Sequence, residues 1–435
     1  MFRKSKAAVD VATLFCAVAL GFLTAACTCA PARPVLKVLT FRDRQSSALR
    51  SVLPEFEKTS GVRVQFDDIP AGTVATKMMT DLAAGGTYDI YAVDEPFIPQ
   101  FQEHLLPLSQ WPDPLSAAEL SLFEPKALEA ATVGSALIGL PVNGNVYQYI
   151  YRKDLFESEL EKLKFKERFK RELRPPATLE EMIQIAQFFH RPPKLYGFAP
   201  FTKMSEGTTV EYLWLMAASG SLLSTQTRSV TLTDIQSALQ NYSELLKTAP
   251  ASARSWHHTE RMSAYSKGKI AQMMTWNSFF FDLEDEHKSL MVGRTGYSKS
   301  PGTSATGLAG TWIAGVRKGS SQLATASAFI RWWTSRPINE ALVLKGLSSA
   351  RSDILTHPTL SQTFPWLKST HINFENAFLR PRHKNYRATS DEISLAFTRW
   401  IAGQSPDNDS ALALQTALNR LKSLSLDQTA RTEAR

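Results

Sequence analysis

Cysteine is almost missing from this 435-residue sequence, and the three that occur lie near the N-terminus. They are Cys16, Cys27 and Cys29, whereas the chain from Arg33 onward has none. Without cysteine, this main part of the protein cannot use a thiol nucleophile, form a structural disulfide or bind a metal through sulfur. A chain of this length buries a core large enough to fold without cross-links, and it has room for two or three domains.

Catalytic signatures are missing as well. The sequence has no P-loop, no nucleophile elbow and no HExxH motif, and its only adjacent histidines are His257 and His258. Adjacent rings do not readily face one metal ion, so we expect a surface pair there and no metal site. Carboxylate pairs for glycoside hydrolysis are defined by their separation in space, which leaves that alternative open. We predict a protein that is not an enzyme and that has no cofactor.

Charge excludes one class of partner. The formal net charge is +8, and removal of the first 26 residues, with three basic and one acidic residue, leaves +6. Basic and aromatic residues do not alternate in the stripes that bind nucleic acid, so we predict no nucleic-acid partner. A modest positive charge is compatible with an anionic surface or simply with solubility.

An apolar run begins the chain and indicates export. Three basic residues precede the run VATLFCAVALGFLTAA (11–26), which ends in small residues, as a signal-peptide cleavage site does. We therefore predict a signal peptide over 1–26 and a tether over 27–32. A permanent membrane anchor is the alternative, but a membrane span needs about 20 apolar residues.

Cys27 stands at the predicted cleavage junction. The preceding residues resemble a bacterial lipobox, in which a large aliphatic residue stands three positions before a cysteine that is then lipidated. Here Thr24 holds that position and Leu23 is displaced by one. We predict lipidation of Cys27 and hence a protein on the outer face of the cytoplasmic membrane. Cleavage after another small residue, giving a free periplasmic protein, is the alternative.

Strands and helices alternate at the start of the main part. We predict strands over 33–41, 62–69 and 87–93, and helices over 47–61 and 75–84, an order typical of a parallel α/β sheet. Ligands of such sheets bind outside the carboxyl ends of the strands. Polar residues stand at two of these ends, in FRD (41–43) and VDE (93–95).

The middle of the chain is predicted to be mostly helical. The densely charged segment 154–174 is typical of one solvated amphipathic helix. Two later helices each begin with a threonine cap in our prediction, Thr178 with Glu181 and Thr233 with Gln236. Before them, LPVNGNVYQYIYRKDLF (140–156) predicts a strand over 142–151.

Eight segments resemble, in order, those of one family. They are LPEFEKTSGVRV, LAAGGTYDIYAVDE, LIGLPVNGNVYQYIYRKDLF, PPATLEEM, AYSKGKIAQMMTWNS, GLAGTWIAGVRKGS, ASAFIRWWTS and LSSARSDIL. Together they resemble the family 1 extracellular solute-binding proteins, the maltose-binding-protein-like receptors of ABC transporters. The resemblance covers about 36–424. Two segments depart from it, because 154–174 is longer and more charged than usual and 202–216 matches only loosely.

The resemblance implies a two-lobed α/β fold of the periplasmic-binding-protein type, with hinge crossings and an interlobe cleft. We expect 33–143 plus 299–350 to form the first lobe, and 147–297 plus 353–435 the second. The crossings would be the stretch around 143–147, the loop SPGTSATG and the segment LSSARSD. Gly, Ser and Pro suit the last two, since hinges must absorb changes in φ and ψ.

Candidate ligand-binding residues lie at these strand ends and crossings. A sugar needs an aromatic platform for its C–H face and planar polar groups for its hydroxyls. The candidates are Phe41, Arg42, Asp43, Glu95, Asn143, Asn145, Trp276, Asn277, Trp312 and Arg351. The resemblance places Asn145 at a cleft position, and it places Trp276 where the family often has a stacking aromatic.

Each candidate has an alternative that the sequence leaves open. Phe41, Trp276 and Trp312 could be core residues, and Asn143 and Asn145 could belong to a turn. Asp94 could cap a helix before Pro96, so Glu95 is the preferred contact. Arg351 could bind solute or form an ion pair between lobes.

The function implied by the resemblance is capture of a sugar, oligosaccharide or polyol by lobe closure. The expected partners are ABC permease subunits with an ATPase, and we expect a monomer. A sugar phosphate such as glycerol phosphate is an alternative solute, since Arg42, Arg351 and the positive charge could serve an anion. A surface lipoprotein of this fold with an adhesion or sensing role is a further alternative.

Overall fold

The computed structural model describes residues 33–221, 230–302 and 306–433. The strands and helices of these residues form one compact unit, Val35–Arg435. The predicted signal peptide, the tether and Cys27 lie outside the described residues.

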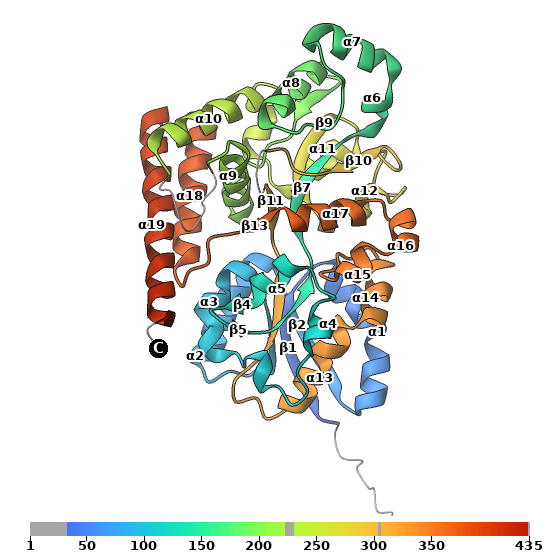
Figure 1. Ribbon diagram of the computed structural model, residues 1–435, viewed down its shortest axis with the longest axis vertical. Helices are drawn as coiled ribbons and strands as arrows, with labels where there is room; N and C mark the ends of the chain where they lie inside the picture. The colour runs from blue at the N-terminus through green and yellow to red at the C-terminus, as the bar shows by residue number, and fades with distance from the viewer. Residues whose placement is uncertain (1–32, 222–229, 303–305, 434–435) are drawn as a thin grey trace, which may run out of the picture. The chain divides into compact units, whose positions relative to one another are not determined.

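The first sheet has the strand order β2-β1-β3-β12-β6 (Figure 1). Its strands are β1 (Val35–Phe41), β2 (Arg63–Ile69), β3 (Ile90–Asp94), β6 (Leu140–Asn143) and β12 (Trp312–Val316). Strand β1 runs parallel to both β2 and β3, whereas β12 runs antiparallel to β3 and β6. The predicted parallel α/β start of the chain is therefore confirmed.

Helices cover the first sheet because each has one apolar face. In α1 (Arg44–Ser60), Leu49, Leu53 and Phe56 recur at helical spacing and are buried. Helices α1, α13 (Leu323–Thr334) and α14 (Arg336–Val343) contact one another, whereas α2 (Val74–Ala83) contacts β1 and β3. Figure 1 shows α2 and α1 on opposite sides of this sheet.

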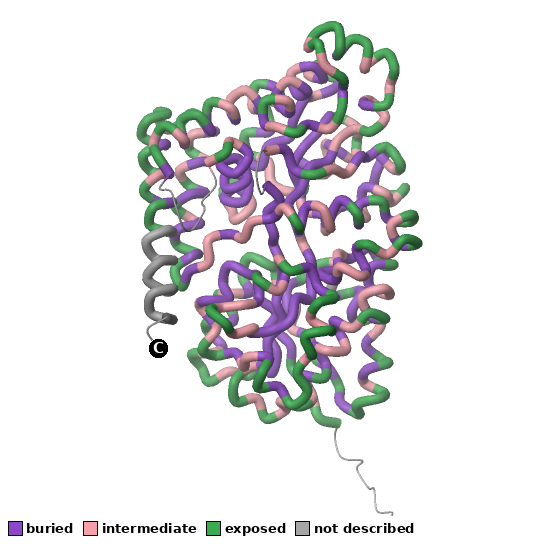
Figure 2. Tube along the Cα trace, viewed as in Figure 1, coloured by how far each residue is buried: buried purple, intermediate pink, exposed green. Residues whose placement is uncertain are grey.

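The second sheet has the order β13-β11-β7-β9-β8, and β10 also pairs with β7. Its strands are β7 (Val146–Arg152), β8 (Tyr196–Phe198), β9 (Ile270–Trp276), β10 (Thr295–Ser298), β11 (Gly307–Ala309) and β13 (Ala377–Leu379). Strands β4 (Thr132–Val133) and β5 (Ala136–Leu137) form a separate small hairpin. Buried residues are concentrated along the strands and the inner helix faces, as Figure 2 shows.

Longer helices pack around the second sheet. They are α8 (Leu179–Phe189), α9 (Glu206–Ala218), α10 (Leu232–Leu246), α17 (Trp366–Glu375), α18 (Tyr386–Ile401) and α19 (Asp407–Glu433). Helix α19 lies beside α10 and α18 (Figure 1). Shorter helices are α3 (Ile98–Phe101), α4 (Ala117–Leu120), α5 (Pro125–Ala131), α11 (His258–Ser266), α12 (Phe280–Leu283), α15 (Ser352–Leu355) and α16 (Pro358–Thr363). None of the helices in the described ranges is long and apolar enough to cross a membrane.

Two helix predictions need correction. The charged segment 154–174 forms two helices, α6 (Lys153–Glu157) and α7 (Glu159–Phe169), because Ser158 is extended and caps the second. Phe165 of α7 is fully buried in a small core with residues of α8. The cap of α10 is Thr231 rather than Thr233, since its hydroxyl accepts the N–H of Asp234. The Thr178 cap of α8 is confirmed.

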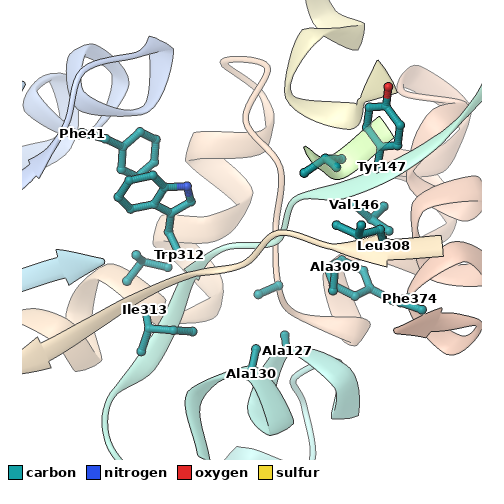
Figure 3. Packing of buried hydrophobic residues seen from close by; sticks show 14 of the residues in the cluster. Phe41, Ala127, Ala130, Val146, Tyr147, Leu308, Ala309, Trp312, Ile313 and Phe374 are labelled. Atoms are coloured by element: carbon teal, nitrogen blue, oxygen red, sulfur yellow. The ribbon is translucent and has the colours of Figure 1, made fainter. Parts of the chain in front are cut away.

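Two segments run side by side from one sheet to the other (Figure 3). The first passes from β6 to β7 through Gly144 and Asn145, and the second from β11 to β12 through Gly310 and Thr311. The N–H of Gly310 donates to the carbonyl oxygen of Asn145 at 2.8 Å, which ties the two crossings together.

The second crossing differs from the sequence prediction. Strand β11 pairs with β7 and β13, so 307–309 belongs to the second sheet and not to the first lobe. The change of sheet occurs at Gly310 and Thr311, beyond most of the loop SPGTSATG, in which 303–305 lies outside the described residues. The third predicted crossing lies against the first, since a β-carbon on Gly144 would be 2.0 Å from the carbonyl oxygen of Ser349.

Candidate functional site

Two aromatic rings meet where β1 and β12 lie closest to the crossings. The ring centroids of Phe41 and Trp312 are 3.9 Å apart, with 30° between the ring planes (Figure 3). Trp312 lies opposite Asn143 on β6 and opposite Asp94 on β3. The first sheet thus brings four polar and aromatic side chains together, although Phe41, Trp312 and Asn143 are buried.

Asn277 connects the backbone on both sides of the first crossing. Its Oδ1 accepts the N–H of Val146 at 3.0 Å, and its Nδ2 donates to the carbonyl oxygen of Gly144 at 3.1 Å. The side chain is therefore held by the chain itself, and the residue is only 3% exposed. This geometry indicates that Asn277 fixes the crossing.

Asn145 and Trp276 are half-buried and adjoin the same glycine. The Oδ1 of Asn145 accepts the N–H of Ser278 at 3.3 Å, whereas its Nδ2 has no hydrogen-bond partner among the described residues. A β-carbon on Gly310 would lie 2.5 Å from the Trp276 ring, so only glycine permits this approach. An amide side chain and an indole ring therefore lie at the same crossing, and both residues are half-buried.

Trp276 packs against Tyr147, whose hydroxyl belongs to a buried hydrogen-bond network. Its ring meets Tyr147 edge to face at 5.2 Å between centroids. The hydroxyl of Tyr147 donates to Glu211 and accepts from Arg261 Nη1 at 3.2 Å. Tyr242 donates to the same carboxylate at 2.8 Å. Burial raises the pKa of Glu211, which Arg261 and the two hydroxyls oppose.

The acidic end of β3 is occupied by an arginine that the sequence did not identify. Arg380 follows β13, and its Nε donates to Glu95 Oε1 at 2.9 Å while its Nη2 pairs with Asp94. Its Nη1 donates to Glu206, the first residue of α9, at 3.1 Å. Partners 174 to 286 positions away carry no local sequence signal; only the carboxylates themselves pointed to this place.

The two carboxylates of β3 have different surroundings. Asp94 caps the short helix η2 (Glu95–Phe97), since its side chain accepts the N–H of Glu95. Glu95 is fully buried, and its Oε2 has no hydrogen-bond partner within the described part of the chain. Burial raises the pKa of Glu95 to about 7, because loss of hydration outweighs the nearby Arg380 charge.

Three predicted residues have internal partners elsewhere. Arg42 is exposed and donates to the carbonyl oxygen of Asp68, and the carbonyl oxygen of Asp43 accepts the hydroxyl of Ser46. The Nε and Nη2 of Arg351 each donate to Asp353 at 2.9 Å, and its Nη1 donates to a backbone carbonyl. Because Asp353 is only two positions away, this pair is local.

A separate pocket of about 240 Å³ contains none of the ten predicted residues. It is lined by Met262, Ser263, Ser266, Lys267, Phe279, Asp282 and Lys288. Its carboxylate, Asp282, forms ion pairs with Lys288 and Arg44. The aromatic and amide residues predicted from the sequence lie at the crossings instead.

Known proteins share this fold and sequence pattern. The family model described as bacterial extracellular solute-binding protein matches residues 42–340. A ribitol complex of an ABC transporter solute-binding protein from Agrobacterium radiobacter K84 has a TM-score of 0.75 and 22% identity, over 90% of this chain and 98% of that chain. Maltose-bound MalE3 of T. maritima has a TM-score of 0.73 and 20% identity, over 89% and 99%.

A curated relative points to the same transport class. A Sinorhizobium fredii protein described as a probable amino-acid ABC transporter periplasmic-binding protein is 23% identical over 334 residues, which is 73% of each chain. The solved structures confirm the two-lobed α/β fold. Because the family model matches more than half of this chain, the chain belongs to the bacterial extracellular solute-binding protein family.

Proposed function

We propose that this protein captures an uncharged carbohydrate, a sugar, oligosaccharide or polyol, at the crossings between its two sheets. One observation carries the proposal: the half-buried indole of Trp276 approaches Gly310, whose N–H donates to the backbone carbonyl oxygen of the half-buried Asn145. The amide NH₂ of Asn145 has no hydrogen-bond partner among the described residues. An indole face suits the C–H face of a sugar, and the amide suits a hydroxyl. The lobes would close over the solute by hinge motion at the crossings.

The relatives support this class of solute, with one exception. The similar structures hold ribitol and maltose, a polyol and a sugar. The Sinorhizobium fredii relative instead makes an amino acid the second candidate. An amino acid needs an acidic group for its ammonium, but Asp94 and Glu95 already pair with Arg380. The geometry therefore favours a neutral solute.

The remaining features complete an importer receptor. The solute-loaded protein would dock on ABC permease subunits driven by an ATPase, acting as a monomeric binding protein rather than an enzyme. Lipidation at Cys27 would hold it on the outer face of the cytoplasmic membrane. A sugar phosphate is less favoured because the donors of Arg351 are bound internally.

A thermal-shift screen of the exported chain tests the proposal. Solute at 100 times its Kd stabilises the folded state by about 2.7 kcal/mol, so binding raises Tm. We expect a sugar or polyol to give the largest shift. A largest shift from an amino acid would favour the second candidate, and one from a sugar phosphate would favour an anionic solute. No shift from any carbohydrate would end the carbohydrate proposal.

Substitution of Asn145 then locates the site. Asn145→Ala removes a solute donor together with one long hydrogen bond, so affinity for the selected solute should fall about tenfold, or about 1.4 kcal/mol. Trp276→Ala should weaken binding further, whereas Trp400→Ala, at a half-buried tryptophan of α18, is the matched control. Unchanged affinity in both site variants would place the solute elsewhere.

A further inference from the structure

We propose that Arg380 is an internal cation that excludes cationic solutes from this site, because it fills the place that a cationic ligand would take among three carboxylates. This inference rests on the proposed function, because it takes the crossings between the two sheets to be the solute site. Its geometry stands on Asp94, Glu95, Glu206 and Arg380 alone.

The guanidinium is enclosed as a bound ligand would be. Each of its three nitrogens meets a different carboxylate: Nε meets Glu95, Nη2 meets Asp94 and Nη1 meets Glu206. Arg380 itself is only 2% exposed. Planar guanidinium groups are the cations best suited to bind several carboxylates at fixed angles.

The carboxylates come from separate parts of the fold. Asp94 ends a strand of the first sheet and Glu95 begins the short helix after it, whereas Glu206 begins α9 and also accepts from Tyr386 and Ser390. Arg380 follows β13 of the second sheet. Without its side chain, three acidic groups would face one another with one nearby cation, Arg382. The charge of Arg382 lowers the pKa of Glu95, whereas burial raises it.

The carboxylates adjoin the proposed solute site. Asp94 lies opposite Trp312, and the N–H of Glu95 donates to the carbonyl oxygen of Thr311 at 3.0 Å. A diamine or guanidinium solute entering here would have to displace Arg380 from its three partners. A neutral solute would leave these three ion pairs in place, so selection against cations follows from the chain itself.

Chemical rescue of Arg380→Ala tests the proposal. The variant leaves a guanidinium-shaped space lined by carboxylates, and a lower Tm is expected because these charges lose their partner. Methylguanidinium at millimolar concentration should raise the Tm of the variant saturably. Its apparent affinity for the variant should be at least tenfold higher than for the wild type. Methylurea, which has a similar shape but no charge, should not.

Controls separate a specific site from a general effect. Arg387→Ala removes an exposed arginine that pairs with Asp391, and its Tm should not respond to methylguanidinium. If Arg380→Ala does not accumulate in folded form, refolding by dilution gives the same test, since folded protein should be recovered only with the cation. Agmatine should bind the variant and not the wild type.

The outcomes distinguish this inference from the proposed function. Absence of rescue, or equal effects of methylguanidinium and methylurea, would overturn the role of Arg380 even if the wild type binds a carbohydrate. Rescue together with new agmatine binding supports that role. Carbohydrate binding by the wild type is measured separately, so its absence would count against the proposed function alone.

Discussion

Substitution of Asn277 by alanine should loosen the first crossing. Its amide holds the N–H of Val146 and the carbonyl oxygen of Gly144, on the two sides of the point where the chain changes sheets. Alanine leaves both backbone groups buried without this partner. Because the side chain connects backbone to backbone, the variant should lose stability before it loses any direct contact with solute.

The magnitude follows from the two lost bonds to the backbone. An unsatisfied buried donor or acceptor costs about 1–3 kcal/mol, so the free energy of unfolding should fall by about 3 kcal/mol. With an unfolding entropy of about 2.1 cal/mol/K per residue and roughly 400 residues, this lowers Tm by roughly 4 °C.

Differential scanning calorimetry of the exported chain measures this shift. Asn277→Asp keeps an acceptor for Val146 but turns an oxygen toward the Gly144 carbonyl, so it should not restore the wild-type Tm. Asn408→Ala, at an exposed asparagine, should change stability by less than about 0.5 kcal/mol. If the Tm of Asn277→Ala lay within about 1 °C of the wild-type Tm, the role assigned to the hydrogen bonds of Asn277 would be refuted.

Two further outcomes follow from the same region. Gly144→Ala places a β-carbon 2.0 Å from the Ser349 carbonyl oxygen, so we expect a larger decrease in Tm than for Asn277→Ala. Gly72→Ala is the control, because there is open space around Gly72. Equal Tm values for Gly144→Ala and Gly72→Ala would contradict the close packing. The pKa of Glu95 is raised from 4.5 to about 7 on folding, so its stabilising contribution is present below pH 4.5 and is lost as pH rises toward 7. This loss amounts to at most about 3 kcal/mol, and urea midpoints across this range should vary less in Glu95→Gln than in the wild type; parallel profiles would count against the raised pKa.

Local sequence patterns predict the parts of the fold that depend on local order. The alternation of strands and helices over 33–94 was readable because each element carries its own apolar spacing. The first crossing was expected only from the family resemblance. The single strand predicted over 142–151 was wrong, because the chain changes sheets at Gly144 and Asn145 and forms the two strands β6 and β7. Strand β11 was assigned to the wrong lobe because Gly307–Ala309 is too short to show a period and follows a loop-like run.

The partners of several site residues lie far away in the sequence, and local patterns could not predict them. Glu95 was expected to meet solute, but its partner Arg380 lies 285 positions later and follows a three-residue strand. The network of Tyr147, Glu211 and Arg261 likewise joins residues from three distant segments. At α10, the sequence VTLTDIQ offers two threonines as possible caps. Thr231 is the cap, because its hydroxyl accepts the N–H of Asp234 and the Asp234 side chain accepts the N–H of Thr231.

Calorimetric titration of the exported chain with the carbohydrate chosen by the screen is the most direct test of the central claim. A matched titration of Asn145→Ala completes it. Saturable binding of a neutral carbohydrate at one site, weakened about tenfold in the variant, is the predicted result. Tighter binding of an amino acid, or equal affinity in the two chains, would contradict the account.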